Sequence, residues 1–70
     1  MAKQIRWYPL YAFYVVFPDG KIGAGNEYRE DAKEAARDLP REWGKGKIYT
    51  LRTVMRMGIE PSDPKSWKIG

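Results

Sequence analysis

The chain of 70 residues contains no cysteine and no histidine. These absences exclude disulfide bonds, thiol chemistry and the usual zinc site, and they remove the commonest general base and the strongest nucleophile of enzymes. The two serines, Ser62 and Ser66, lie in the last part of the chain and have no candidate base. The composition therefore favours a binding protein over an enzyme, and we expect no catalytic residue, no metal site and no cofactor.

Phosphate-binding motifs and membrane-spanning runs are also missing. The pattern that begins at Gly23 and Gly25 fails as a dinucleotide fingerprint, because Tyr28 occupies the third glycine position. The apolar run from Trp7 to Phe17 is too short to span a bilayer, and its alternating character and Pro9 favour a strand over a signal peptide. The absence of cysteine is compatible with the cytosol, and we expect a cytoplasmic protein that does not bind membranes.

Positive charge is present and is unevenly distributed. The formal net charge is +4, and residues 45–59 contribute Lys45, Lys47, Arg52 and Arg56 without any acidic residue. A localised positive field favours nucleic acid or an acidic protein surface as a partner.

Two neighbouring segments have the pattern of a β-hairpin. Residues 10–17 are rich in aromatic and β-branched side chains, which suit a pleated sheet. Pro18, Asp19 and Gly20 follow as a turn, and residues 21–28 form the returning strand. Gly23 and Gly25 in that strand indicate a bulge or a close approach of another part of the backbone.

A helix is predicted over residues 31–39. Asp31 is a suitable N-cap with Glu34 three residues later, and Pro40 ends the helix. Small and apolar residues recur at helical spacing and predict a narrow stripe that packs on the sheet; they are Ala32, Ala35, Ala36 and Leu39.

The third strand is predicted over residues 47–57. The sequence thus predicts one α+β domain over residues 1–58, with a three-stranded antiparallel sheet and one helix on one face, in the order β-β-α-β. Residues 59–70 contain two prolines and no periodicity, and predict an extended tail that is mobile unless Trp67 holds it to the body.

One helix covers only one face of such a sheet, so the other face should be open. If the odd-numbered residues of the first and third strands share the core, the open face combines aromatic, hydroxyl and basic groups. We expect the binding site to comprise Tyr14, Thr50, Arg52 and Arg56 on this face, with Lys45 and Lys47 beside it. Arginine and tyrosine suit both protein hot spots and nucleic-acid contacts.

The layout also has two family resemblances. The stretch YVVFPDGKIGAG followed by DAKEAARDL resembles part of the arm-type DNA-binding domains of integrases, although those place the whole sheet before the helix. The DAKEAA helix is followed by YTLRTVMR and then by a tail with prolines. This order is similar to that of small phage-encoded proteins that inhibit host RNA polymerase. The chain lacks the acidic strip that such an inhibitor can use, and neither resemblance assigns a functional residue.

Two functional hypotheses follow from these observations. The first is a small non-enzymatic accessory or inhibitor-type protein that docks on a larger, nucleic-acid-handling protein through the basic and aromatic sheet face. The alternative is direct binding of DNA or RNA by the same face. The sequence leaves open the identity of the partner and the oligomeric state.

Overall fold

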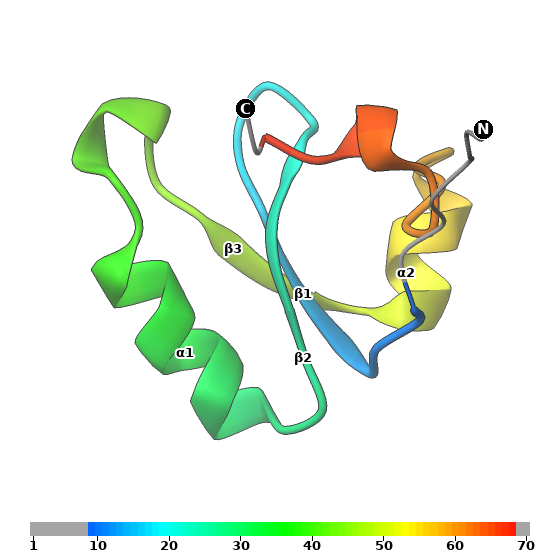
Figure 1. Ribbon diagram of the computed structural model, residues 1–70, viewed down its shortest axis with the longest axis horizontal. Coiled ribbons are helices and arrows are strands. Elements are labelled where there is room, and N and C mark those ends of the chain that lie inside the picture. Colours follow the sequence, from blue (N-terminus) through cyan, green and yellow to red (C-terminus); the bar gives the residue numbers. More distant parts are fainter. Residues whose placement is uncertain (1–8, 69–70) are drawn as a thin grey trace, which may run out of the picture.

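The computed structural model describes residues 9–68, so the predictions for residues 1–8, 69 and 70 lie outside the described part. Its strands are β1 (Phe13–Val16), β2 (Ile22–Asn26) and β3 (Lys47–Thr50), which form an antiparallel sheet in the order β2-β1-β3. The helices α1 (Arg29–Asp38) and α2 (Leu51–Arg56) lie on either side of this sheet (Figure 1). The predicted α+β class is confirmed, as is the order strand, strand, helix, strand.

The turn between β1 and β2 has the predicted chemistry. Gly20 has a positive φ of 83°, a conformation that glycine adopts at little cost, and its N–H donates to the carbonyl of Phe17 at 2.8 Å. The Asp19 side chain accepts a hydrogen bond from the N–H of Lys21 at 3.0 Å. The hairpin is therefore fixed by its own turn residues.

The glycines of β2 make room for large neighbouring side chains. Val15 faces Ala24 while Val16 faces Ile22, so Gly23 is the extra residue of a bulge. A Cβ atom at Gly23 would collide with the ring of Phe17. The predicted bulge is confirmed, although side chains rather than another backbone make the close approach.

Helix α1 packs its small-residue stripe on the sheet. Ala32 is fully buried, and Ala36 and Leu39 pack in the same cluster as Val15 of β1. The helix begins before the predicted start, because Tyr28 is the N-cap and Asp31 lies in the first turn. Asp31 therefore does not cap the helix as the sequence indicated.

Residues 51–56 form helix α2, so the prediction of one strand over residues 47–57 is wrong beyond Thr50. The Thr50 hydroxyl accepts a hydrogen bond from the N–H of Thr53 at 3.3 Å and caps the helix. Gly58 follows the helix with a φ of 85°, and the N–H of Ile59 bonds to the carbonyl of Val54 at 3.2 Å. The helix therefore ends in a Schellman motif. The apolar contact that accompanies this motif is also present, because Ile59 packs with Val54 in one core cluster.

Both faces of the sheet carry a core cluster. Tyr14 pairs with Tyr49, so the odd-numbered residues of β1 share a face with the even-numbered residues of β3, contrary to the prediction. One face buries Val15 under α1. The other buries Tyr14 under α2, whose Val54 belongs to the same cluster, and under the C-terminal segment. The expected open face is therefore mostly covered, because the chain turns back over it after Thr50.

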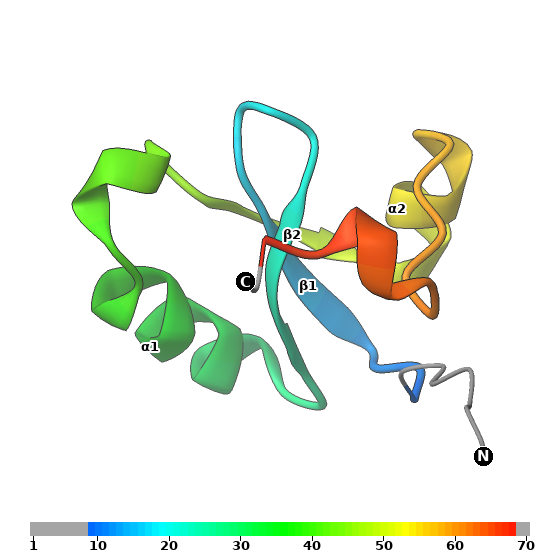
Figure 2. The ribbon, with the colours of Figure 1, turned by 45° about the horizontal axis from the view of Figure 1, so that its top comes forward.

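The C-terminal segment, described as far as residue 68, completes this cover. It contains a short 3₁₀ helix, η2 (Pro64–Ser66), and then runs beside β2 (Figure 2). Trp67 forms a bridge with Ile22, whose carbonyl accepts a hydrogen bond from the N–H of Lys68 at 2.8 Å. The Trp67 indole N–H also donates to the carbonyl of Pro61 within the same segment at 2.7 Å. The indole packs against the core cluster of Tyr14, and this contact holds the segment to the body.

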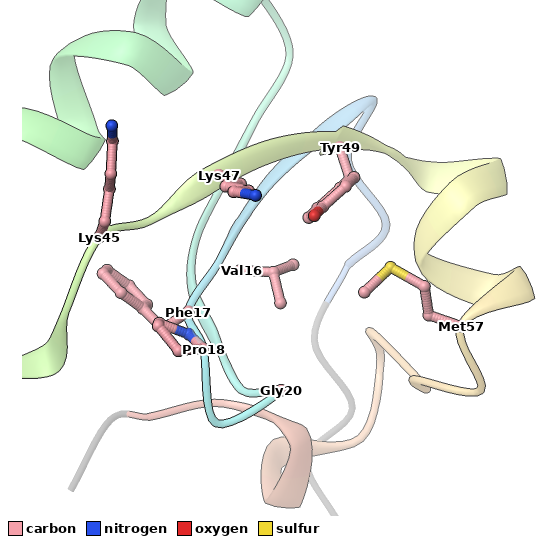
Figure 3. Close-up of a pocket in the computed structure, with 8 residues that line it drawn as sticks. All are labelled: Val16, Phe17, Pro18, Gly20, Lys45, Lys47, Tyr49 and Met57. Carbon is pink, nitrogen blue, oxygen red and sulfur yellow. The ribbon is translucent and has the colours of Figure 1, made fainter.

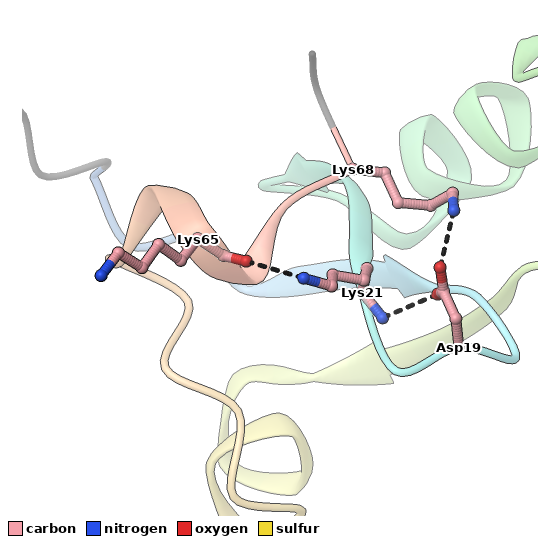
Figure 4. Close-up of polar contacts among 4 residues, drawn as sticks. All are labelled: Asp19, Lys21, Lys65 and Lys68. Atoms are coloured by element: carbon pink, nitrogen blue, oxygen red, sulfur yellow. Dashed lines mark hydrogen bonds and ion pairs between the residues drawn. The ribbon is translucent and has the colours of Figure 1, made fainter.

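A charged contact ties the end of this segment to the hairpin turn. The Lys68 ammonium lies 2.7 Å from a carboxylate oxygen of Asp19, and the Lys21 ammonium donates to the carbonyl of Lys65 at 3.2 Å (Figure 4). The hydrogen bond from Lys68, followed by that from the N–H of Lys21, lowers the pKa of Asp19.

Candidate binding surface

Tyr14 lies in the core rather than on a binding face. Its side chain is 0% exposed, and its hydroxyl oxygen accepts a hydrogen bond from the N–H of Tyr11 at 2.7 Å. The Tyr14 ring makes an edge contact with Trp67 at a centroid distance of 6.1 Å. Burial raises the pKa of the Tyr14 hydroxyl. A partner cannot reach this residue without opening the fold.

The two arginines of the predicted site lie on α2 rather than on a strand. Arg52 and Arg56 are four residues apart, so they share one face of the helix, and both are exposed. Val54 lies midway between them and is fully buried, which places the arginines on the side that faces away from the core. Thr50 is also exposed, and its hydroxyl caps the helix.

Lys45 and Lys47 lie at a pocket with a volume of about 360 Å³ between the hairpin turn and the end of α2. Figure 3 shows Lys47 and Tyr49 along β3, with Val16 behind them and Met57 opposite. The Lys45 side chain starts at the same rim but points toward α1 (Figure 3). The pocket is the part of this sheet face that α2 and the C-terminal segment leave uncovered.

The pocket combines cationic and apolar chemistry. Its lining contains no acidic side chain, and Val16, Pro18 and Met57 supply apolar surface beside the two lysines. Among residues 9–68 the one ion pair joins Lys68 to Asp19, so Lys45, Lys47, Arg52 and Arg56 have no carboxylate partner there. We give the name β3–α2 surface to the pocket residues Lys45, Lys47, Tyr49 and Met57 together with Arg52 and Arg56 on the exposed side of α2.

Tyr49 and Met57 are the residues of this surface that the sequence did not single out. The sequence did contain the signals for the helix that places Met57, namely Thr50 as a possible N-cap and Gly58 as a possible C-terminal stop. Apolar side chains gather nearby as well, since Met55 is 58% exposed and Leu10 is 55% exposed. Both line a smaller pocket with Ile59, and Met55 directly precedes Arg56 in α2.

Two kinds of site are absent from the described part of the chain. Residues 9–68 contain no group of three or more acidic side chains that could hold a metal ion. No helix within that range is long and apolar enough to cross a membrane.

The fold and this surface define a small α+β protein with a basic and apolar surface along one edge strand and the following helix. Comparisons with family models, with curated proteins and with solved structures found no significant match.

Proposed function

We propose that this chain is a small, cytoplasmic, non-enzymatic accessory protein of inhibitor type, which docks on an acidic region of a larger protein through the β3–α2 surface. The observation that carries the proposal is the pocket in which Lys45 and Lys47 stand beside Val16 and Met57 with no acidic residue in the lining. Cations without an internal partner attract carboxylates, and apolar walls reward the burial of an apolar side chain.

This surface suits a protein partner better than it suits the unpaired bases of a single-stranded nucleic acid. Base recognition by single-strand binders depends on accessible aromatic platforms, whereas Tyr14 is fully buried and Tyr49 is half-buried. The exposed apolar side chains near the arginines are Met55 and Met57, and methionine adapts readily to protein surfaces. The partner class that we favour is a larger, nucleic-acid-handling protein with an acidic region on its surface.

Direct binding of DNA or RNA is the second candidate, and one observation favours it. Lys33, Arg37, Arg41 and Lys45 line another pocket of about 340 Å³, and none has a carboxylate partner among the described residues. Such a cluster can contact phosphates without reading bases. Direct binding through phosphates requires that the chain binds a random oligonucleotide and that its affinity falls steeply as the salt concentration rises.

The test uses a photo-crosslinking amino acid at position 49, with position 28 as the matched control. Tyr28 is 68% exposed and lies in neither pocket, so a specific partner should crosslink from position 49 and not from position 28. The purified partner should then bind the Lys45→Glu, Lys47→Glu double variant at least about tenfold more weakly than the wild type. Lys65→Glu, which changes the charge by two units outside both pockets, is the charge-matched control for each of the single variants Lys45→Glu and Lys47→Glu.

Equal affinity of the wild type and the double variant for the crosslinked partner would refute the β3–α2 surface as the docking site. Tight, salt-sensitive binding to a random oligonucleotide with no crosslinked protein would favour the second candidate.

A further inference from the structure

Strand β3 lies at an edge of the sheet and has one paired neighbour, β1. The N–H of Leu51 donates to the carbonyl of Ala12 at 3.0 Å, and this pair continues the register of β1 and β3. Hydrogen-bonded pairs alternate along an antiparallel ladder. Tyr49 therefore bonds to Tyr14, while the backbone groups of Ile48 and Thr50 point away from β1.

These outward groups have no partner in the described part of the chain. No turn, cap or side-chain hydrogen bond involves the N–H or the carbonyl of Ile48, or the N–H of Thr50. Unpaired N–H and carbonyl groups along a strand edge are a template for another strand. The edge is short, but it offers both a donor and an acceptor at Ile48.

Cationic side chains lie on both sides of this edge. On the α1 side, Lys33 and Arg37 share a pocket with Lys45, and on the other side Lys47 lies beside Tyr49. A strand added next to β3 would direct its side chains alternately to these two sides. The α1 side offers only cations for charged contacts, whereas the other side also offers apolar surface.

This charge pattern selects the occupant. A second copy of the chain would bring its own basic β3, with Lys45 and Lys47, to an edge that cations already flank, and an excess of like charge at a strand pair is destabilising. An extended segment that alternates acidic and apolar residues would instead place carboxylates toward α1 and apolar side chains toward the pocket of Val16 and Met57.

We infer that the partner completes the sheet by adding an extended acidic and apolar segment to the outer edge of β3. Main-chain hydrogen bonds to Ile48 and Thr50 supply the pairing, and the two pockets select the side chains. This inference rests on the proposed function, which it deepens by naming the form and chemistry of the bound segment.

The test uses an acetylated and amidated heptapeptide of alternating glutamate and valine as the probe, with the full chain labelled for amide hydrogen exchange. The peptide should slow exchange at the N–H groups of Ile48 and Thr50, because these become hydrogen-bonded. Two further peptides carry N-methyl groups on all the glutamates or on all the valines. One of these should bind at least about tenfold more weakly than the other, since only one edge of the peptide faces β3.

A charge variant supplies the protein-side control. Lys33→Glu with Arg37→Glu should weaken binding of the parent peptide at least about fivefold, whereas Lys65→Glu should change it by less than about twofold. Both lysines and the arginine are exposed, so these changes should leave the fold intact.

The outcomes separate this inference from the proposed function. Unchanged exchange at Ile48 and Thr50, with equal affinity of all three peptides, would overturn strand addition. Charge attraction would then be the remaining explanation of peptide binding. If the crosslinked partner still loses affinity for the Lys45→Glu, Lys47→Glu variant, the proposed function survives that result.

Discussion

Trp67 is the residue whose removal should most clearly test how the second face of the sheet is closed. Its indole packs on Tyr14 and donates a hydrogen bond to Pro61, and the adjoining backbone bonds to Ile22. Truncating a well-packed aromatic side chain costs about 3–5 kcal/mol, and we take the lower end because Trp67 is partly exposed. We therefore expect Trp67→Ala to lose about 3 kcal/mol of unfolding free energy.

This loss is large for a chain of 70 residues, whose whole unfolding free energy is about 4–10 kcal/mol. A loss of 1 kcal/mol lowers the Tm of such a domain by about 4–8 °C. Thermal unfolding followed by circular dichroism should accordingly show a Tm lower by about 12–24 °C in Trp67→Ala.

Two variants separate the contributions of the Trp67 side chain. Trp67→Phe keeps a ring but removes the donor to the Pro61 carbonyl, so it should lose about 1–2 kcal/mol. Lys65→Ala, on the same segment, changes an exposed side chain and should stay within about 0.5 kcal/mol of the wild type. A Tm for Trp67→Ala within about 3 °C of the wild type would show that the C-terminal segment does not close this core.

Two further perturbations test the packing of Gly46, just before β3, and the contact at the hairpin turn. A Cβ atom at Gly46 would lie 2.6 Å from Val15 Cγ1, so Gly46→Ala should cost about 2 kcal/mol of unfolding free energy by overpacking. This loss should lower the urea midpoint of unfolding, whereas the control Lys45→Ala should leave the midpoint nearly unchanged. Equal midpoints for the two variants would contradict this packing. Because the folded-state pKa of Asp19 lies below its ordinary value of 3.8, its stabilising effect is present above that value and is lost as the pH falls through the folded-state pKa. The Tm of Asp19→Asn should therefore lie below that of the wild type at about pH 7 and approach it at about pH 2, and a gap that persists in acid would refute the role of the carboxylate.

Local signals in the sequence were sufficient for much of the fold. The hairpin could be predicted because Gly20 and its neighbours determine the turn by their own backbone preferences. Helix α1 could be predicted because Ala32, Ala36 and Leu39 recur at helical spacing and Pro40 ends the pattern. Its start was misplaced, since Tyr28 caps the helix without any side-chain hydrogen bond that a motif could reveal.

The candidate site was predicted only in part. Lys45 and Lys47 do lie at a pocket, and Arg52 and Arg56 are exposed, but the arginines belong to a helix. The alternation of apolar and polar residues after Lys47 fits a strand as well as it fits the short helix α2. The cap at Thr50 and the stop at Gly58 were available as competing signals.

The sequence by itself determined the composition of the surface: a basic segment over residues 45–59, no cysteine or histidine chemistry, and an α+β order of elements. Only the tertiary structure decided which groups reach solvent. The register of β1 and β3 depends on contacts between distant residues, and it put Tyr14 in the core. The turn after Thr50 brought α2 and Trp67 over the face that the sequence left open, because the apolar side chains there could be buried only by folding the chain back. On that face the pocket beside β3 stays accessible, and its lysines have no carboxylate partner among residues 9–68.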